Sequence, residues 1–170
     1  GTLSAQAPTP AGPPPYAADY AAMQTKFIEL AEAMPADKYG WRPMEGVHSV
    51  SEVFMLIAAE NYVVPGVWGA AAPEGVAVSN ALFRELSNVT AKAEVVAHLK
   101  KSSEYFRGAV AAVGSERLGE TVTLFGRQRS LQEALYVMAG DMHEHLGQAI
   151  AYARANNIVP PWTARRQQGN

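Results

Sequence analysis

Apolar side chains recur every three or four positions in four long segments of the chain, which is the spacing of one face of an α-helix. We therefore predict helices over residues 16–34, 49–64, 90–114 and 130–156. The second and fourth segments begin with Ser-x-x-Glu, a capping box in which serine and glutamate satisfy backbone N–H groups at the helix start. Four amphipathic helices joined by connections of modest length predict an all-α four-helix bundle.

The connecting segments contain the residues that break helices. Pro35 should end the first helix, Pro65-Gly66 the second and Gly114 the third, and we expect Thr90 to cap the start of the third. A short helical turn is expected at residues 80–86. Residues 121–125 are expected to form one short strand or an extended arm before a turn at Gly126.

The chain divides into three parts by composition. Residues 1–15 are rich in proline and are expected to be disordered, residues 16–162 to form the bundle, and residues 163–170 to form a polar tail. Ala5-Gln6-Ala7 is similar to the end of a signal peptide, so we expect export to the periplasm or the extracellular space. The alternative is an ordinary flexible leader on a cytoplasmic protein.

Composition excludes several classes of function. The 170 residues contain no cysteine, so the chain offers no thiolate metal ligand and no cysteine nucleophile. The net charge of −2 provides no basic surface for nucleic acid, and there is no uninterrupted apolar run of the length that spans a membrane. Neither a Gly-x-Ser-x-Gly elbow nor a glycine-rich phosphate loop is present.

Three ionisable residues fall on faces that are otherwise apolar. His145 lies near the centre of the apolar face of the fourth helix, and Asp141 lies on its flank four residues earlier. Glu60 lies near the centre of the apolar face of the second helix. A buried carboxylate is costly unless it is paired or bound to a cation, so the three residues indicate either a metal or catalytic site or a hydrogen-bonded cluster.

The remaining histidines carry less information. His98 flanks the apolar face of the third helix and could reach the same interior, but a solvated edge is the better expectation. His143 is expected to be exposed, and His48 to be a loop residue before the second helix.

Several segments, taken in order, resemble the DinB family of four-helix-bundle metal-dependent enzymes, and the likeness covers residues 16–162. They are Tyr39–Pro43, Val47–Val53, Phe125-Gly126 before Ser130, Glu144–Gln148, Tyr152–Arg154 and Ile158–Trp162.

The resemblance implies an up-down-down-up bundle, often a homodimer, with three histidines around a divalent metal. One histidine belongs to the second helix and two, four residues apart, to the fourth. His145 matches one ligand, Asp141 replaces another, and Leu56 occupies the position of the ligand on the second helix. Glu60, one turn further along, could complete a site for Mn, Fe, Ni or Zn, with His98 a weaker substitute.

The outer face of the fourth helix carries small residues that bear on the homodimer. Gly140 and Gly147 lie there together with Tyr136, and this patch could admit a helix of a partner subunit closely.

Two functions remain open, and with them the question of whether the protein is an enzyme. The loss of a ligand at Leu56 favours a metal-free, non-catalytic bundle that binds a small molecule or forms a dimer. The alternative is a metal-dependent hydrolase or a thiol-dependent transferase of the DinB type, with His145, Asp141 and Glu60 in its site.

Overall fold

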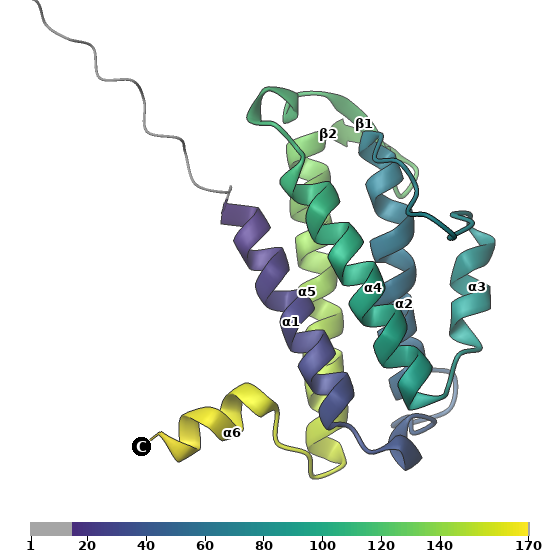
Figure 1. Cartoon of the computed structure of the whole chain (residues 1–170), viewed down its shortest axis with the longest axis vertical. Helices are drawn as coiled ribbons and strands as arrows, with labels where there is room; N and C mark the ends of the chain where they lie inside the picture. The colour runs from purple at the N-terminus through teal and green to yellow at the C-terminus, as the bar shows by residue number, and fades with distance from the viewer. Residues whose placement is uncertain (1–14, 170) are drawn as a thin grey trace, which may run out of the picture.

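The computed structural model describes residues 15–169 (Figure 1). The expectations of a disordered leader and a signal-peptide end fall on residues 1–14, outside the described residues. The helices and strands are α1 (Pro15–Ala33), α2 (Val50–Val63), α3 (Ala81–Ser87), α4 (Lys92–Ala111), β1 (Thr121–Leu124), β2 (Arg127–Ser130), α5 (Leu131–Ala155) and α6 (Pro161–Gln168). Short 3-10 helices lie at η1 (Ala36–Lys38), η2 (Val64–Trp68) and η3 (Ser115–Arg117).

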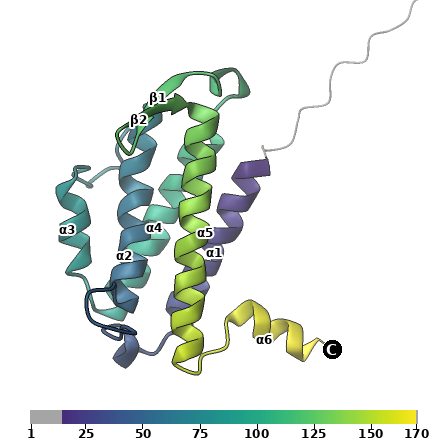
Figure 2. The ribbon, with the colours of Figure 1, turned by 180° about the vertical axis from the view of Figure 1, so that it is seen from behind.

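The long helices α1, α2, α4 and α5 form the bundle, with α1 and α2 antiparallel, α2 and α4 parallel, and α4 and α5 antiparallel (Figures 1 and 2). This is the up-down-down-up order, and it confirms the prediction of an all-α four-helix bundle. Helix α3 lies on the outer side of the bundle beside α2 and α4, the β-hairpin covers one end, and α6 projects from the other end beside α1.

Both predicted capping boxes are present. The Glu52 backbone N–H donates to Ser49 Oγ at 3.3 Å, and the Ser49 N–H donates to Glu52 Oε2 at 2.6 Å. The pair Ser130 and Glu133 makes the same two bonds at 3.2 and 2.9 Å. Each box satisfies two backbone donors that a helix start leaves without partners, and so fixes the starts of α2 and α5.

Both boundaries of α4 differ from the prediction, and at its start a tertiary contact accompanies the difference. Ala91, and not Thr90, is the N-cap of α4, and the next residue, Lys92, donates to the carbonyl oxygens of Glu32 and Met34 at the end of α1. The prediction that Gly114 closes this helix is wrong as well. The helix ends at Ala111, and Gly114 has φ −72° in extended backbone.

Two connections contain more regular structure than predicted. The chain stays helical past Pro65, because this proline stands near the start of η2, where its missing N–H costs no hydrogen bond. Gly69, with φ 81°, ends η2. Residues 121–130 form a two-stranded antiparallel hairpin and not a single strand. Its two-residue turn places Phe125 at φ 50° and Gly126 at φ 73°, the left-handed pair of a type I′ turn.

The polar tail expected at residues 163–170 is helical up to Gln168. Pro161 begins α6 at the first helical position, which tolerates proline. Helix α6 is attached to α1 by an ion pair between Arg165 and Glu29 at 2.9 Å and by Lys26, which lies 5.6 Å from the Trp162 ring centre.

The stretch from Val50 to Trp68 has the length and mean hydropathy, 1.3, of a membrane-spanning helix. Of its most apolar window, 72% is buried inside the bundle, so core packing accounts for its apolar composition.

A layer of buried polar side chains connects the bundle helices next to Glu60 and Asp141. Gln24 of α1 and Asn61 of α2 exchange amide hydrogen bonds at 2.6 and 3.0 Å, and Asn61 also donates to Ser102 Oγ of α4 at 3.1 Å. Gln24 Nε2 further contacts Met142 Sδ of α5 at 3.6 Å. The layer therefore links all four helices. Two of its members, Asn61 and Met142, directly follow Glu60 and Asp141 in the sequence.

The outer face of α5 is exposed as the sequence predicted. Tyr136 is 68% exposed, and Gly140 and Gly147 lie on the same solvent-facing side. A homodimer through this face stays a prediction.

We expect Asn61→Leu to lower the free energy of unfolding by about 2–4 kcal/mol, because it leaves the buried Gln24 amide without a partner. The double variant Gln24→Leu/Asn61→Leu should recover much of this loss, since both amides are then replaced by apolar groups of similar size. Urea unfolding of the two variants and the wild type measures the effect. Additive losses in the double variant would contradict the coupling.

Candidate metal centre

Glu60, Asp141 and His145 come together between α2 and α5. One ligand atom from each residue lies within 4.8 Å of the other two. Helix α5 presents Asp141 and His145 on one face because they are four residues apart, and the antiparallel course of α2 brings Glu60 opposite them.

His145 and Asp141 do not form a hydrogen bond with each other. His145 Nε2 lies 3.9 Å from Asp141 Oδ2, which is beyond hydrogen-bonding distance. Asp141 Oδ2 and Glu60 Oε2 are both buried, and neither has a hydrogen-bond partner. Among residues 15–169, no lysine or arginine forms an ion pair with either carboxylate. The site therefore holds negative charge that the protein itself leaves uncompensated.

The environment of Glu60 opposes its ionisation. Glu60 is 5% exposed. Burial raises its pKa well above the ordinary value of 4.5, and the negative charge of Asp141 and a hydrogen bond to Asp141 raise it further. Without a cation, the two carboxylates are best accommodated with one proton between them.

A chain of hydrogen bonds orients the His145 ring. Its Nδ1 lies 3.1 Å from Gln148 Oε1, an oxygen that only accepts, so the hydrogen-bond network assigns the proton to Nδ1. Gln148 Nε2 donates to the Tyr152 hydroxyl at 3.0 Å, which donates to the His48 carbonyl oxygen at 2.9 Å. The lone pair of Nε2 is thereby directed towards Asp141 and is free to bind a cation.

Gln148 and Tyr152 were not among the residues predicted for the site. Their spacing from His145 could have indicated them, because positions 145, 148 and 152 lie on one helix face. Polar residues at such spacing behind a candidate ligand are suited to hold its ring in place.

A cavity of about 490 Å³ opens beside His145. Gln148 and the loop before α2 line it, including His48 and Arg42, and Arg42 is paired with Glu52 at 3.2 Å. A larger hollow of about 670 Å³ lies at the C-terminal end of α1 beside the start of α4, and none of the three cluster residues lines it. Of the two hollows, the one beside His145 is thus the one that borders the cluster, and it does so through His145.

The other residues considered from the sequence lie outside the cluster. Leu56 is half-buried on α2 and offers no donor atom, so it cannot supply the ligand expected at that position. His98 lines a different cavity, between α3 and α4. His143 is exposed and lies 2.9 Å from Asp19 Oδ2, and His48 is an exposed loop residue, as predicted.

The donor set fits a divalent cation. Two carboxylates and one imidazole suit Mn, Fe, Ni or Zn, and three protein ligands leave positions for a solvent or substrate atom. Bonds of about 2.1 Å place neighbouring ligand atoms ~3.0–3.5 Å apart, so atoms separated by as much as 4.8 Å need to draw together by ~1.3–1.8 Å. The two buried oxygens without partners are the atoms that such a cation would satisfy.

The family relationship follows from a match over most of the chain. The family model of the DinB superfamily matches residues 19–149. The chain belongs to the DinB superfamily. This confirms the resemblance seen in the sequence, and within the DinB fold the candidate ligands of this chain are Glu60, Asp141 and His145.

Solved DinB-like structures share the fold at low sequence identity. A DinB-like protein from Bacillus cereus ATCC 10987 is 14% identical with a TM-score of 0.71, and the match covers 86% of this chain and 93% of that one. A DinB-like protein from Bacillus subtilis is also 14% identical with a TM-score of 0.64, over 85% and 93% of the two chains. The chain matches no curated protein.

We expect the stability of the metal-free protein to fall as pH rises above about 5. The folded pKa of Glu60 lies above its unfolded value, so in this range the folded state binds more protons than the unfolded state. The slope from this group is at most about 1.4 kcal/mol per pH unit. Glu60→Gln should remove that component and be more stable than the wild type at neutral pH.

Urea unfolding from pH 5 to 8 in the presence of a chelator measures this slope. Glu144→Gln, an exposed substitution on α5, is the matched control and should keep the wild-type slope. Equal slopes in the wild type and Glu60→Gln would show that Glu60 ionises normally in the folded protein.

Proposed function

We propose that this DinB protein binds one divalent cation through Glu60, Asp141 and His145 and uses it in a metal-dependent reaction. The observation that carries the proposal is the meeting of two buried carboxylate oxygens without partners and one imidazole nitrogen. The 3.9 Å between His145 and Asp141 is too long for a hydrogen bond, and the three ligand atoms lie within 4.8 Å of one another, near the spacing of a shared ligand sphere.

A metal explains the cluster better than a hydrogen-bonded arrangement does. A cluster built for its own stability would pair each buried oxygen with a donor, as the Gln24–Asn61 layer one residue away does. The cluster leaves both oxygens open, while a relay through Gln148 and Tyr152 holds the His145 ring. Orientation of a histidine by such outer groups is typical of metal ligands.

The chemistry follows from the open coordination positions. A bound cation lowers the pKa of a coordinated water or thiol and so supplies a nucleophile at neutral pH. Because the chain has no cysteine, a thiol at the site would come from a small cosubstrate. The cavity beside His145 would receive the substrate, which favours a hydrolase or a thiol-dependent transferase over a purely structural site.

Calorimetric titration of the metal-free protein with Mn²⁺, Ni²⁺ and Zn²⁺ tests the proposal. We expect one site per chain, with affinity reduced at least tenfold to a hundredfold in Glu60→Gln and in His145→Ala, because each removes a ligand. His143→Ala is the matched control, since it deletes an exposed histidine two residues away on the same helix.

The variant Leu56→His should bind the metal more tightly than the wild type, because Leu56 occupies the position of a family ligand. Binding that is equally strong in the wild type, Glu60→Gln and His145→Ala would place the metal elsewhere. Absence of binding in the wild type would favour the non-catalytic bundle.

The proposed reaction predicts an exchangeable position on the metal. In protein loaded with Co²⁺, a small thiol such as 2-mercaptoethanol should produce a thiolate-to-cobalt absorption band, because it can occupy an open position. The wild type should show the band and His145→Ala should not. A cobalt spectrum that does not respond to thiol would exclude the transferase and leave the hydrolase.

A further inference from the structure

A third cavity, of about 460 Å³, lies between α2, α3 and α4. Tyr62 contributes to its wall, and because Tyr62 follows Glu60 by two residues it points to the opposite side of α2. The apolar part of the wall comes from α3 and the loops on either side of it, with Leu82, Leu86 and Val89 among its residues. The volume is in the range of small-molecule sites.

Tyr62, a residue of the cavity wall, carries a hydroxyl without a hydrogen-bond partner. The residue is 2% exposed, and its hydroxyl oxygen is buried with no hydrogen-bond partner. Burial raises the pKa of Tyr62, so the group is a neutral donor at physiological pH. The neighbouring Tyr105 ring packs 6.3 Å away, but its own hydroxyl is used by the Ala71 carbonyl oxygen. A buried hydroxyl without a partner is costly, and a ligand oxygen would satisfy it.

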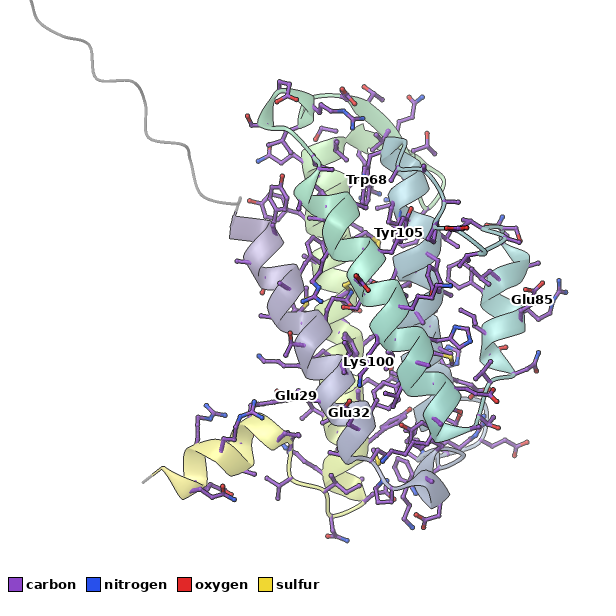
Figure 3. The ribbon with its side chains drawn as sticks, in the orientation of Figure 1. Glu29, Glu32, Trp68, Glu85, Lys100 and Tyr105 are labelled. Atoms are coloured by element: carbon purple, nitrogen blue, oxygen red, sulfur yellow. The ribbon has the colours of Figure 1, made fainter. Side chains whose placement is uncertain are left out.

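The remaining polar wall carries positive charge from α4. Lys101 and His98 line the cavity, and within residues 15–169 neither forms an ion pair with a carboxylate. The preceding lysine, Lys100, faces the other way and pairs with Glu32 of α1 at 2.6 Å (Figure 3). Glu85 of α3 is exposed on the opposite wall and disfavours a ligand with a second negative charge.

We propose that this cavity binds a small amphipathic monocarboxylate, in which the carboxylate accepts a hydrogen bond from Tyr62 and pairs with Lys101. The alkyl or aryl body packs against Leu82, Leu86 and Val89. The site is separate from the metal centre and does not depend on the proposed function.

Calorimetric titration with hexanoate, heptanoate and octanoate tests the proposal. We expect saturable binding at one site, with affinity rising threefold to fourfold for each added methylene while the cavity has room. Octylamine, which has the same body and the opposite charge, should not compete. Even weak sites are occupied at an octanoate concentration of about 10 mM. If binding does not saturate at that concentration, the proposal is overturned.

Matched variants locate the site. Tyr62→Phe should weaken octanoate about tenfold while leaving the unliganded protein at least as stable as the wild type, because it removes a hydroxyl without a partner. Lys101→Gln should weaken octanoate about threefold to tenfold, and Lys100→Gln, which removes the same charge from the other face of α4, should not. His145→Ala should bind octanoate normally.

Two results would contradict the assignment. One is octanoate affinity unchanged in both Tyr62→Phe and Lys101→Gln. The other is a loss of stability in unliganded Tyr62→Phe, which would mean that the hydroxyl already has a structural partner.

Discussion

Burial of the Glu60 carboxylate beside Asp141 is the constraint on which the rest of this bundle depends. Two groups of like charge meet between α2 and α5, and no lysine or arginine among residues 15–169 pairs with them. In a low-dielectric interior this arrangement is stable only with a shared proton or a cation. Bringing the two carboxylates together is unfavourable. Other contacts must therefore stabilise the register of α2 against α5 that produces it.

The neighbouring polar layer maintains that register. Asn61 and Met142 follow Glu60 and Asp141 directly in sequence, and Gln24 contacts both of them. Because the amide pair has a directional geometry, sliding α2 along α1 would break its hydrogen bonds, and the contact of Gln24 with Met142 ties α5 to the same layer. The same layer thus secures the bundle and holds the two carboxylates in place.

The helical framework could be predicted from the sequence because its signals are local. The capping boxes at Ser49 and Ser130 and the apolar periodicity locate α2 and α5 correctly. The N-cap of α4 was misplaced because Lys92 contacts α1, a contact between segments far apart in sequence. The second strand was missed because β2, Arg127–Ser130, has no alternation of apolar residues and depends on the Phe125-Gly126 turn.

The candidate site was predictable only in part. Ionisable residues on apolar faces identified Glu60, Asp141 and His145, and the family pattern identified the missing ligand at Leu56. Glu60 lies one turn beyond Leu56 along α2, and the antiparallel packing of α2 and α5 brings it within 4.8 Å of its partners, which the sequence could not establish. The relay from His145 through Gln148 and Tyr152 to His48 crosses between elements and could not be deduced from spacing alone.

The central claim is that Glu60, Asp141 and His145 together hold a cation, and elemental analysis of the purified protein tests it most directly. The protein is prepared without chelator or metal-affinity tag, and Glu60→Gln is prepared in parallel. We expect about one equivalent of a divalent transition metal in the wild type and a large loss in the variant. A wild-type protein that is free of metal and takes up none on dialysis against Mn²⁺, Ni²⁺ or Zn²⁺ would contradict the account.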